Sequence, residues 1–154
     1  MRIGIIVYSV SGHTLSVAAR LQDALSVAGH AVSLERLETV GPATVGNEQA
    51  PLKSSPAVGG VDALILATPV RGGTPAPPML SYLEQAPALD GKRVACLVTG
   101  FFPARWGCDQ TIAQLRQICE AKGATVCGAG SVRWFGPGRG QRIQRAVAEL
   151  VELF

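Results

Sequence analysis

The sequence predicts an α/β fold in which an open, doubly wound parallel sheet carries helices on both faces. Five short runs are rich in apolar and β-branched residues, which is typical of strands buried on both faces. Segments with the apolar spacing of amphipathic helices alternate with these runs. The chain of 154 residues is long enough to build a sizeable core, so we expect a single domain over residues 1–154.

The first part of the chain predicts two strands on either side of one helix. A strand over residues 3–7 leads through a polar turn into a helix over residues 13–27, which ends before Gly29. Alternating polar and apolar residues predict an edge strand over residues 31–37. Residues 38–60 are rich in proline and glycine, so we expect a long loop with at most one short helix near residues 43–50.

The second part of the chain predicts three further strands, each followed by a helix. The strands are expected over residues 61–68, 93–99 and 124–132. The helices are expected over residues 77–84, 108–121 and 139–153. Because ligands of such sheets bind beyond the carboxyl ends of the strands, the loops after the first, third and fourth strands should form the site.

The turn after the first strand has the composition of an anion site. Ser9, Ser11 and Thr14 surround Gly12, and a helix with unpaired, partly positive N–H groups begins at once. The hydroxyl groups add donors, and His13 adds positive charge when it is protonated. In the alternative interpretation these hydroxyl groups only cap the helix and His13 is solvated. We predict that this turn binds a phosphate group.

Composition and motifs exclude several other classes of function. The net charge of +3 is small and dispersed, so no nucleic-acid interface is expected. No apolar run is long enough for a membrane span or a secretion signal. The GxxxxGK[ST] and GxGxxG motifs of nucleotide-binding loops are absent. The four cysteines lack the paired spacing of a zinc site, so we expect no metal and a cytoplasmic location with reduced thiols.

The run Ser9-Val10-Ser11-Gly12-His13-Thr14 resembles the phosphate loop of flavodoxins, which reads [Ser/Thr]-x-[Ser/Thr]-Gly-x-Thr after the first strand. Residues 67–73 resemble the second flavin loop of that family, and residues 99–101 resemble the start of the third. The resemblance implies a flavodoxin-like, five-stranded sheet in the order 2-1-3-4-5, with FMN as the cofactor.

The resemblance also implies which residues contact FMN. They are Ser9, Ser11, Gly12, His13 and Thr14 in the first loop; Pro69, Val70, Arg71 and Gly72 in the second; and Thr99, Gly100, Phe101, Phe102 and Trp106 in the third. Gly72 can adopt the positive φ that lets a neighbouring peptide reorient beside the flavin, although an ordinary turn glycine would do the same. At least one of the three aromatic side chains should stack on the flavin, unless they all close the core.

Two departures from flavodoxins favour an enzyme. Flavodoxins are acidic, whereas this chain has an isoelectric point near 8.9. The loops carry Arg71 and Arg105, with Asp109 as the one nearby acid, and such positive charge would stabilise an anionic reduced flavin. We expect an FMN-dependent oxidoreductase that passes electrons from NAD(P)H or a reductase to a quinone-like acceptor or a redox partner protein.

Several points stay open from the sequence. A one-electron carrier and a flavin-free scaffold of the same fold are alternative functions. Cys108 stands at a predicted helix start, where a thiolate is stabilised, so a redox role competes with plain packing. The catalytic residues are undetermined, and a homo-oligomer that completes the flavin site is consistent with the long loop at residues 38–60.

Overall fold

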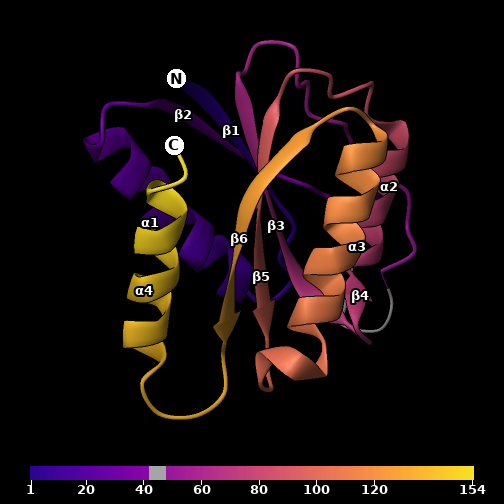
Figure 1. Ribbon diagram of the computed structural model, residues 1–154. Coiled ribbons are helices and arrows are strands. Elements are labelled where there is room, and N and C mark those ends of the chain that lie inside the picture. Colours follow the sequence, from indigo (N-terminus) through magenta and orange to yellow (C-terminus); the bar gives the residue numbers. More distant parts are fainter. Residues whose placement is uncertain (42–47) are drawn as a thin grey trace.

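The computed structural model describes residues 1–41 and 48–154, and its centre is a parallel sheet (Figure 1). Its main strands are β1 (Arg2–Val7), β2 (Ala31–Arg36), β3 (Ala63–Arg71), β5 (Arg93–Gly100) and β6 (Thr125–Arg133). They lie in the order β2-β1-β3-β5-β6, and this confirms the order predicted for five parallel strands. The short helix expected near residues 43–50 falls mostly outside the described residues.

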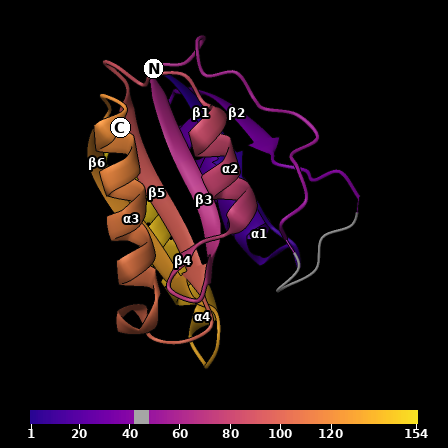
Figure 2. The same cartoon turned by 90° about the vertical axis from the view of Figure 1, so that its right-hand side faces the viewer.

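Helices cover both faces of the sheet. Figure 1 shows α1 (His13–Val27) and α4 (Arg139–Val151) on one face, with α2 (Pro77–Gln85) and α3 (Cys108–Ala121) on the other. Figure 2, which shows the molecule from the side, shows the sheet lying between these two layers of helices. Among the described residues, no helix is both long and apolar enough to cross a membrane.

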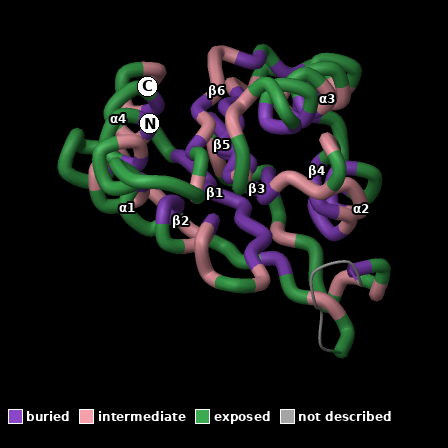
Figure 3. Tube along the Cα trace, turned by 90° about the horizontal axis from the view of Figure 1, so that it is seen from below, coloured by how far each residue is buried: buried purple, intermediate pink, exposed green. Residues whose placement is uncertain are grey.

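Two hydrophobic cores result from the alternation of side chains along the strands. Ile3, Ile5 and Val7 pack with α1 and α4, whereas Ile6 packs with α2 and α3 on the other face. The central strands β1, β3 and β5 are therefore buried on both sides, as their continuous apolar runs predicted, whereas β2 is a partly exposed edge strand. Figure 3 shows the buried centre of the molecule. This rigid centre fixes where each strand ends.

Helix boundaries were predicted more accurately than strand ends. Residues 13–27 and 108–121 are helical as expected, but β3 continues past residue 68 to Arg71. The Ala67 carbonyl accepts a hydrogen bond from the N–H of Tyr8, the residue that follows β1, and Pro69, two residues later, faces the same side beyond the end of β1. A missing N–H costs nothing there, so proline does not end the strand.

Candidate functional site

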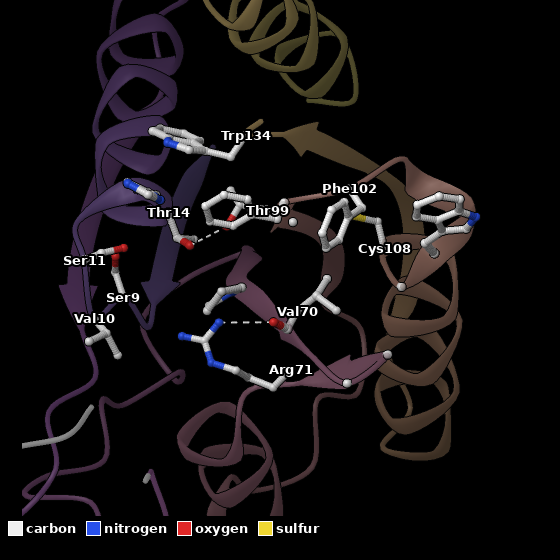
Figure 4. A pocket seen from close by; sticks show the side chains of 18 of the residues that line it. Ser9, Val10, Ser11, Thr14, Val70, Arg71, Thr99, Phe102, Cys108 and Trp134 are labelled. Carbon is white, nitrogen blue, oxygen red and sulfur yellow. Dashed lines mark hydrogen bonds between the residues drawn. The ribbon is translucent and has the colours of Figure 1, made fainter. Parts of the chain in front are cut away.

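A cavity of about 670 Å³ lies at the carboxyl edge of the sheet, where the three predicted loops meet (Figure 4). The predicted residues that line it are Ser9, Ser11, His13, Thr14, Pro69, Val70, Arg71, Gly72, Thr99, Gly100, Phe101, Phe102 and Trp106. Gly12 does not line it. The structure therefore brings residues from three distant parts of the sequence to one place.

The first loop leaves the N-terminus of α1 open toward the cavity. Gly12 begins the helix with φ of +89°, a left-handed conformation that suits glycine. Within the described residues no side chain caps α1, and its first turn has no acidic residue. Ser9 Oγ instead accepts a hydrogen bond from the Gly12 N–H at 3.1 Å. The remaining N–H groups of this turn are suited to an anion.

Thr14 joins the first loop to the third. Its hydroxyl group lies 2.7 Å from that of Thr99, and both side chains are buried (Figure 4). The Thr14 hydroxyl group therefore already has a hydrogen-bond partner within the protein, whereas the Ser11 side chain is exposed. The Thr14–Thr99 contact fixes the distance between the phosphate end of the cavity and its third loop.

The second loop, for which the sequence predicted no strand, is a β-hairpin. The two-residue strand β4 (Thr74–Pro75) pairs antiparallel with the end of β3. Gly72 and Gly73 form the turn with φ of +62° and +80°, as a tight two-residue hairpin requires. Gly72 has the positive φ that was expected, and the pairing of β3 with β4 holds this turn in place.

The third loop packs closely on its neighbours. A Cβ atom added at Gly100 would lie 2.8 Å from Cys108 Sγ, and one at Gly107 would lie 2.9 Å from Val70 Cγ1. Cys108 is buried, and burial raises the pKa of its thiol to about 11. The raised pKa disfavours the thiolate that a redox role of Cys108 would require, although Cys108 does line the cavity.

The aromatic side chains of the third loop are at the surface of the cavity. Phe101, Phe102 and Trp106 are 56%, 57% and 62% exposed, so the alternative that they close the core is wrong. Trp134, which the sequence reasoning missed, also lines the cavity, from the loop that follows β6. The rule that ligands lie at the carboxyl edge could have indicated this fourth loop.

His13 lies against the ring of Trp134. The two rings are stacked, with centroids 4.1 Å apart and planes inclined by 15°. Burial, and then the charge of Arg139, lower the pKa of His13 below its ordinary value near 6.5. The lowered pKa disfavours the protonated form that would lend positive charge to a phosphate, and the ring instead stacks on Trp134.

Arg71 is not the free cation that the sequence indicated. Its Nε lies 2.6 Å from Oε1 of Glu48, whose side chain is only 2% exposed. Burial raises the pKa of the nearby Tyr8 phenol, and the negative charge of Glu48 raises it further. The statement that Asp109 is the one acid near the loops is therefore wrong, because sequence separation hid Glu48.

Arg105 also differs from the expectation. Its guanidinium lies over the ring of Trp106, at 5.4 Å from the centroid, and it is not among the residues that line the cavity. Among the described residues Arg105 forms no ion pair, and the arginine that does line the cavity, Arg71, is paired with Glu48.

These features fit FMN. The open N-terminus of α1 suits the phosphate, and the apolar space between Val70 and the exposed aromatic rings suits a planar flavin ring. The Gly72–Gly73 turn brings bare backbone to the same cavity, where peptide groups can hydrogen bond to the flavin edge.

The chain is similar to known proteins in sequence and in fold. Residues 1–134 match the family model described as NADPH-dependent FMN reductase. No curated protein sequence matches the chain significantly.

Solved structures with this fold include a flavodoxin of Streptococcus pneumoniae TIGR4, at 18% identity over 100% of both chains with a TM-score of 0.68. A flavoprotein from Lactobacillus acidophilus NCFM, solved in complex with FMN, shares 15% identity over 94% of this chain and 97% of its own, with a TM-score of 0.68. The Trp repressor binding protein of Bacillus subtilis shares 16% identity over 100% of this chain and 99% of its own, with a TM-score of 0.71. The predicted flavodoxin-like fold is confirmed.

Proposed function

Because the chain belongs to the NADPH-dependent FMN reductase family, we propose that it oxidises NADPH through FMN held in the carboxyl-edge cavity. The family confirms FMN, which the sequence predicted from its first loop. When bound, FMN supplies a ring that accepts a hydride and passes on its electrons. The observation that carries the proposal is the union of an open helix N-terminus, a hairpin turn and exposed aromatic rings in one cavity.

We assign the phosphate of FMN to the N–H groups of Val10, Ser11, His13 and Thr14 and to the hydroxyl groups of Ser9 and Ser11. The turn at Gly72 and Gly73 contacts the edge of the flavin, and Phe102 or Trp106 covers one face. The buried hydrogen bond between Thr14 and Thr99 keeps the phosphate-binding loop at a fixed distance from the third loop, which borders the flavin. The chain's own part is therefore to bind, to orient and to exclude water from one face of the flavin.

We further propose a small quinone-like molecule as the electron acceptor, because the exposed aromatic rim can stack a second planar ring. A redox partner protein is the alternative acceptor. The free thiols of Cys96, Cys108, Cys119 and Cys127 are consistent with a reducing, cytoplasmic compartment. A homo-oligomer that completes the site is compatible with this arrangement.

The test is anaerobic mixing of the FMN-loaded protein with NADPH, followed by a quinone. NADPH should bleach the visible absorbance of the bound flavin, and the quinone should restore that absorbance. Dithionite serves as the control that the bound flavin is reducible. Bleaching by dithionite without bleaching by NADPH would overturn the enzyme and favour a one-electron carrier.

A further inference from the structure

All aromatic side chains that the structure exposes strongly lie in one row at the mouth of the cavity. Trp106, Phe102, Phe101 and Phe135 follow one another with ring centroids 5.9, 6.3 and 6.2 Å apart. Each is between 56% and 64% exposed. Phe135 is not among the residues that line the cavity, so this aromatic row continues beyond the space proposed for FMN.

The outer end of the aromatic row is held by the backbone. The Trp134 N–H donates to the carbonyl of Gly100 at 2.6 Å, and the Phe135 N–H donates to that of Phe101 at 3.2 Å. The guanidinium of Arg142 donates to the carbonyls of Arg133, Phe135, Gly136 and Pro137. The exposure of Phe135 is therefore a fixed feature of this segment and not the result of a loose loop.

Arginines lie at this end of the row, and the guanidinium of Arg139 lies 4.7 Å from the centroid of the Trp134 ring. Among the described residues, Arg133, Arg139 and Arg142 form no ion pair with a carboxylate. Burial and the charges of Arg133 and Arg139 lower the pKa of Arg142, which indicates that the three guanidinium groups repel one another. Glu149 of α4 and Glu152, which caps the end of that helix, lie about 15 Å or more along the helix axis from Arg139.

An exposed ring beside unpaired arginines matches a ligand that has both an aromatic base and a phosphate group. A second copy of this chain fits poorly, because it would bring the same arginines face to face. We propose that Phe135, Arg133 and Arg139 bind the phosphorylated adenosine of NADPH, with the adenine on Phe135 and the 2′-phosphate on the two arginines. The proposal rests on the proposed function, in which the nicotinamide enters the cavity and the adenosine end leaves along the row.

The first test is calorimetric titration of the FMN-loaded protein with adenosine 2′,5′-bisphosphate and with adenosine 5′-monophosphate. The bisphosphate should bind more tightly, because only it carries the 2′-phosphate. Arg139→Gln and Arg133→Gln should each weaken it by about tenfold, or 1.4 kcal/mol, and leave the monophosphate nearly unchanged. Arg145→Gln is the matched control, because Arg145 is an exposed arginine of the same helix outside this cluster.

Equal weakening by all three variants would overturn the subsite and indicate only general attraction to a basic surface. Tight binding that neither Arg139→Gln nor Arg133→Gln changes would overturn it as well. The second test compares kcat/KM for NADPH and NADH, and Arg139→Gln should lower only the first. Arg139-dependent binding of the bisphosphate without any flavin reduction by NADPH would support the subsite and overturn the proposed function.

Discussion

At the scale of single residues, the pairing of Arg71 with Glu48 changes what the cavity can do. The sequence suggested that Arg71 would lend positive charge to a reduced flavin. The structure places a buried carboxylate 2.6 Å from its Nε, so the pair is close to neutral as seen from the cavity. A buried carboxylate beside a buried phenol is costly, and its role should be visible in the redox potential of the bound cofactor.

Replacing Glu48 with Gln should raise the midpoint potential of bound FMN. The change leaves the charge of Arg71 uncompensated, and that charge favours the anionic reduced cofactor. We expect a shift on the order of 30 mV, which for a two-electron couple corresponds to about 1.4 kcal/mol. Spectroelectrochemical titration of the loaded protein measures it.

Two further variants make this prediction specific. The double variant Glu48→Gln with Arg71→Gln should return the potential toward that of the parent protein. Glu38→Gln is the control, because Glu38 is 60% exposed and lies 3.9 Å from Lys53 at the surface. An unchanged potential in Glu48→Gln would show that the pair has no electrostatic effect on the cofactor, and a lower potential would contradict the predicted sign.

His13 should titrate below its ordinary pKa near 6.5, because burial and Arg139 disfavour its charged form. The unfolded chain then binds more protons than the folded chain between the lowered pKa and about 6.5. His13 therefore contributes stability above that window, and the contribution is lost as the pH falls through it.

Proton NMR of the imidazole ring resonances measures the pKa of His13 directly. Arg139→Gln should raise it by removing the positive charge, and Arg145→Gln should leave it unchanged. If Arg139→Gln did not move the titration, burial alone would account for the shift.

At the scale of elements, the sequence predicted the helices, whose apolar residues recur at regular spacing, and missed the hairpin, which depends on local strand ends. Helices α1 and α3 were placed to the residue, because their apolar spacing and their following glycines agree. The hairpin at the end of β3 was missed, since proline normally argues against a strand. The strand can continue through Pro69 because the pairing of β3 with β1 ends at Ala67, so the missing N–H of Pro69 has no partner in β1 to lose.

The candidate site follows the same division. Its three loops were predicted because motifs mark them, and the cavity unites all their predicted residues except Gly12. Glu48 and Trp134 were missed because no motif marks them. Their partners, Arg71 and His13, are 23 and 121 residues away in sequence.

The Gly72–Gly73 turn should tolerate no side chain at its second residue. Gly73→Ala places a Cβ at φ of +80°, which costs roughly 1–2 kcal/mol in a left-handed conformation. We expect a lower urea midpoint and weaker FMN binding, because the hairpin borders the cavity. Gly60→Ala is the control, since Gly60 has no positive φ and has open space around its Cα. Equal effects of both changes would argue against a special role of the hairpin.

At the scale of the whole molecule, the cofactor should act as a clamp on three loops from different parts of the chain. FMN at about 100 times its Kd stabilises the folded state by about 2.7 kcal/mol. For a chain of this size that corresponds to a rise of Tm of roughly 5–10 °C. Thermal unfolding followed by circular dichroism, with and without FMN, measures it. A Tm that does not respond to FMN would contradict the assignment of the cavity.

The same folding pattern makes the protein its own optical sensor. The chain has two tryptophans, Trp106 and Trp134, and both line the cavity although 28 positions separate them. Tryptophan emission overlaps flavin absorption, so a flavin in the cavity would drain the excited state of every indole in the chain. Loading with FMN should therefore quench almost all of the tryptophan fluorescence. Release of the cofactor should restore that fluorescence without any added label.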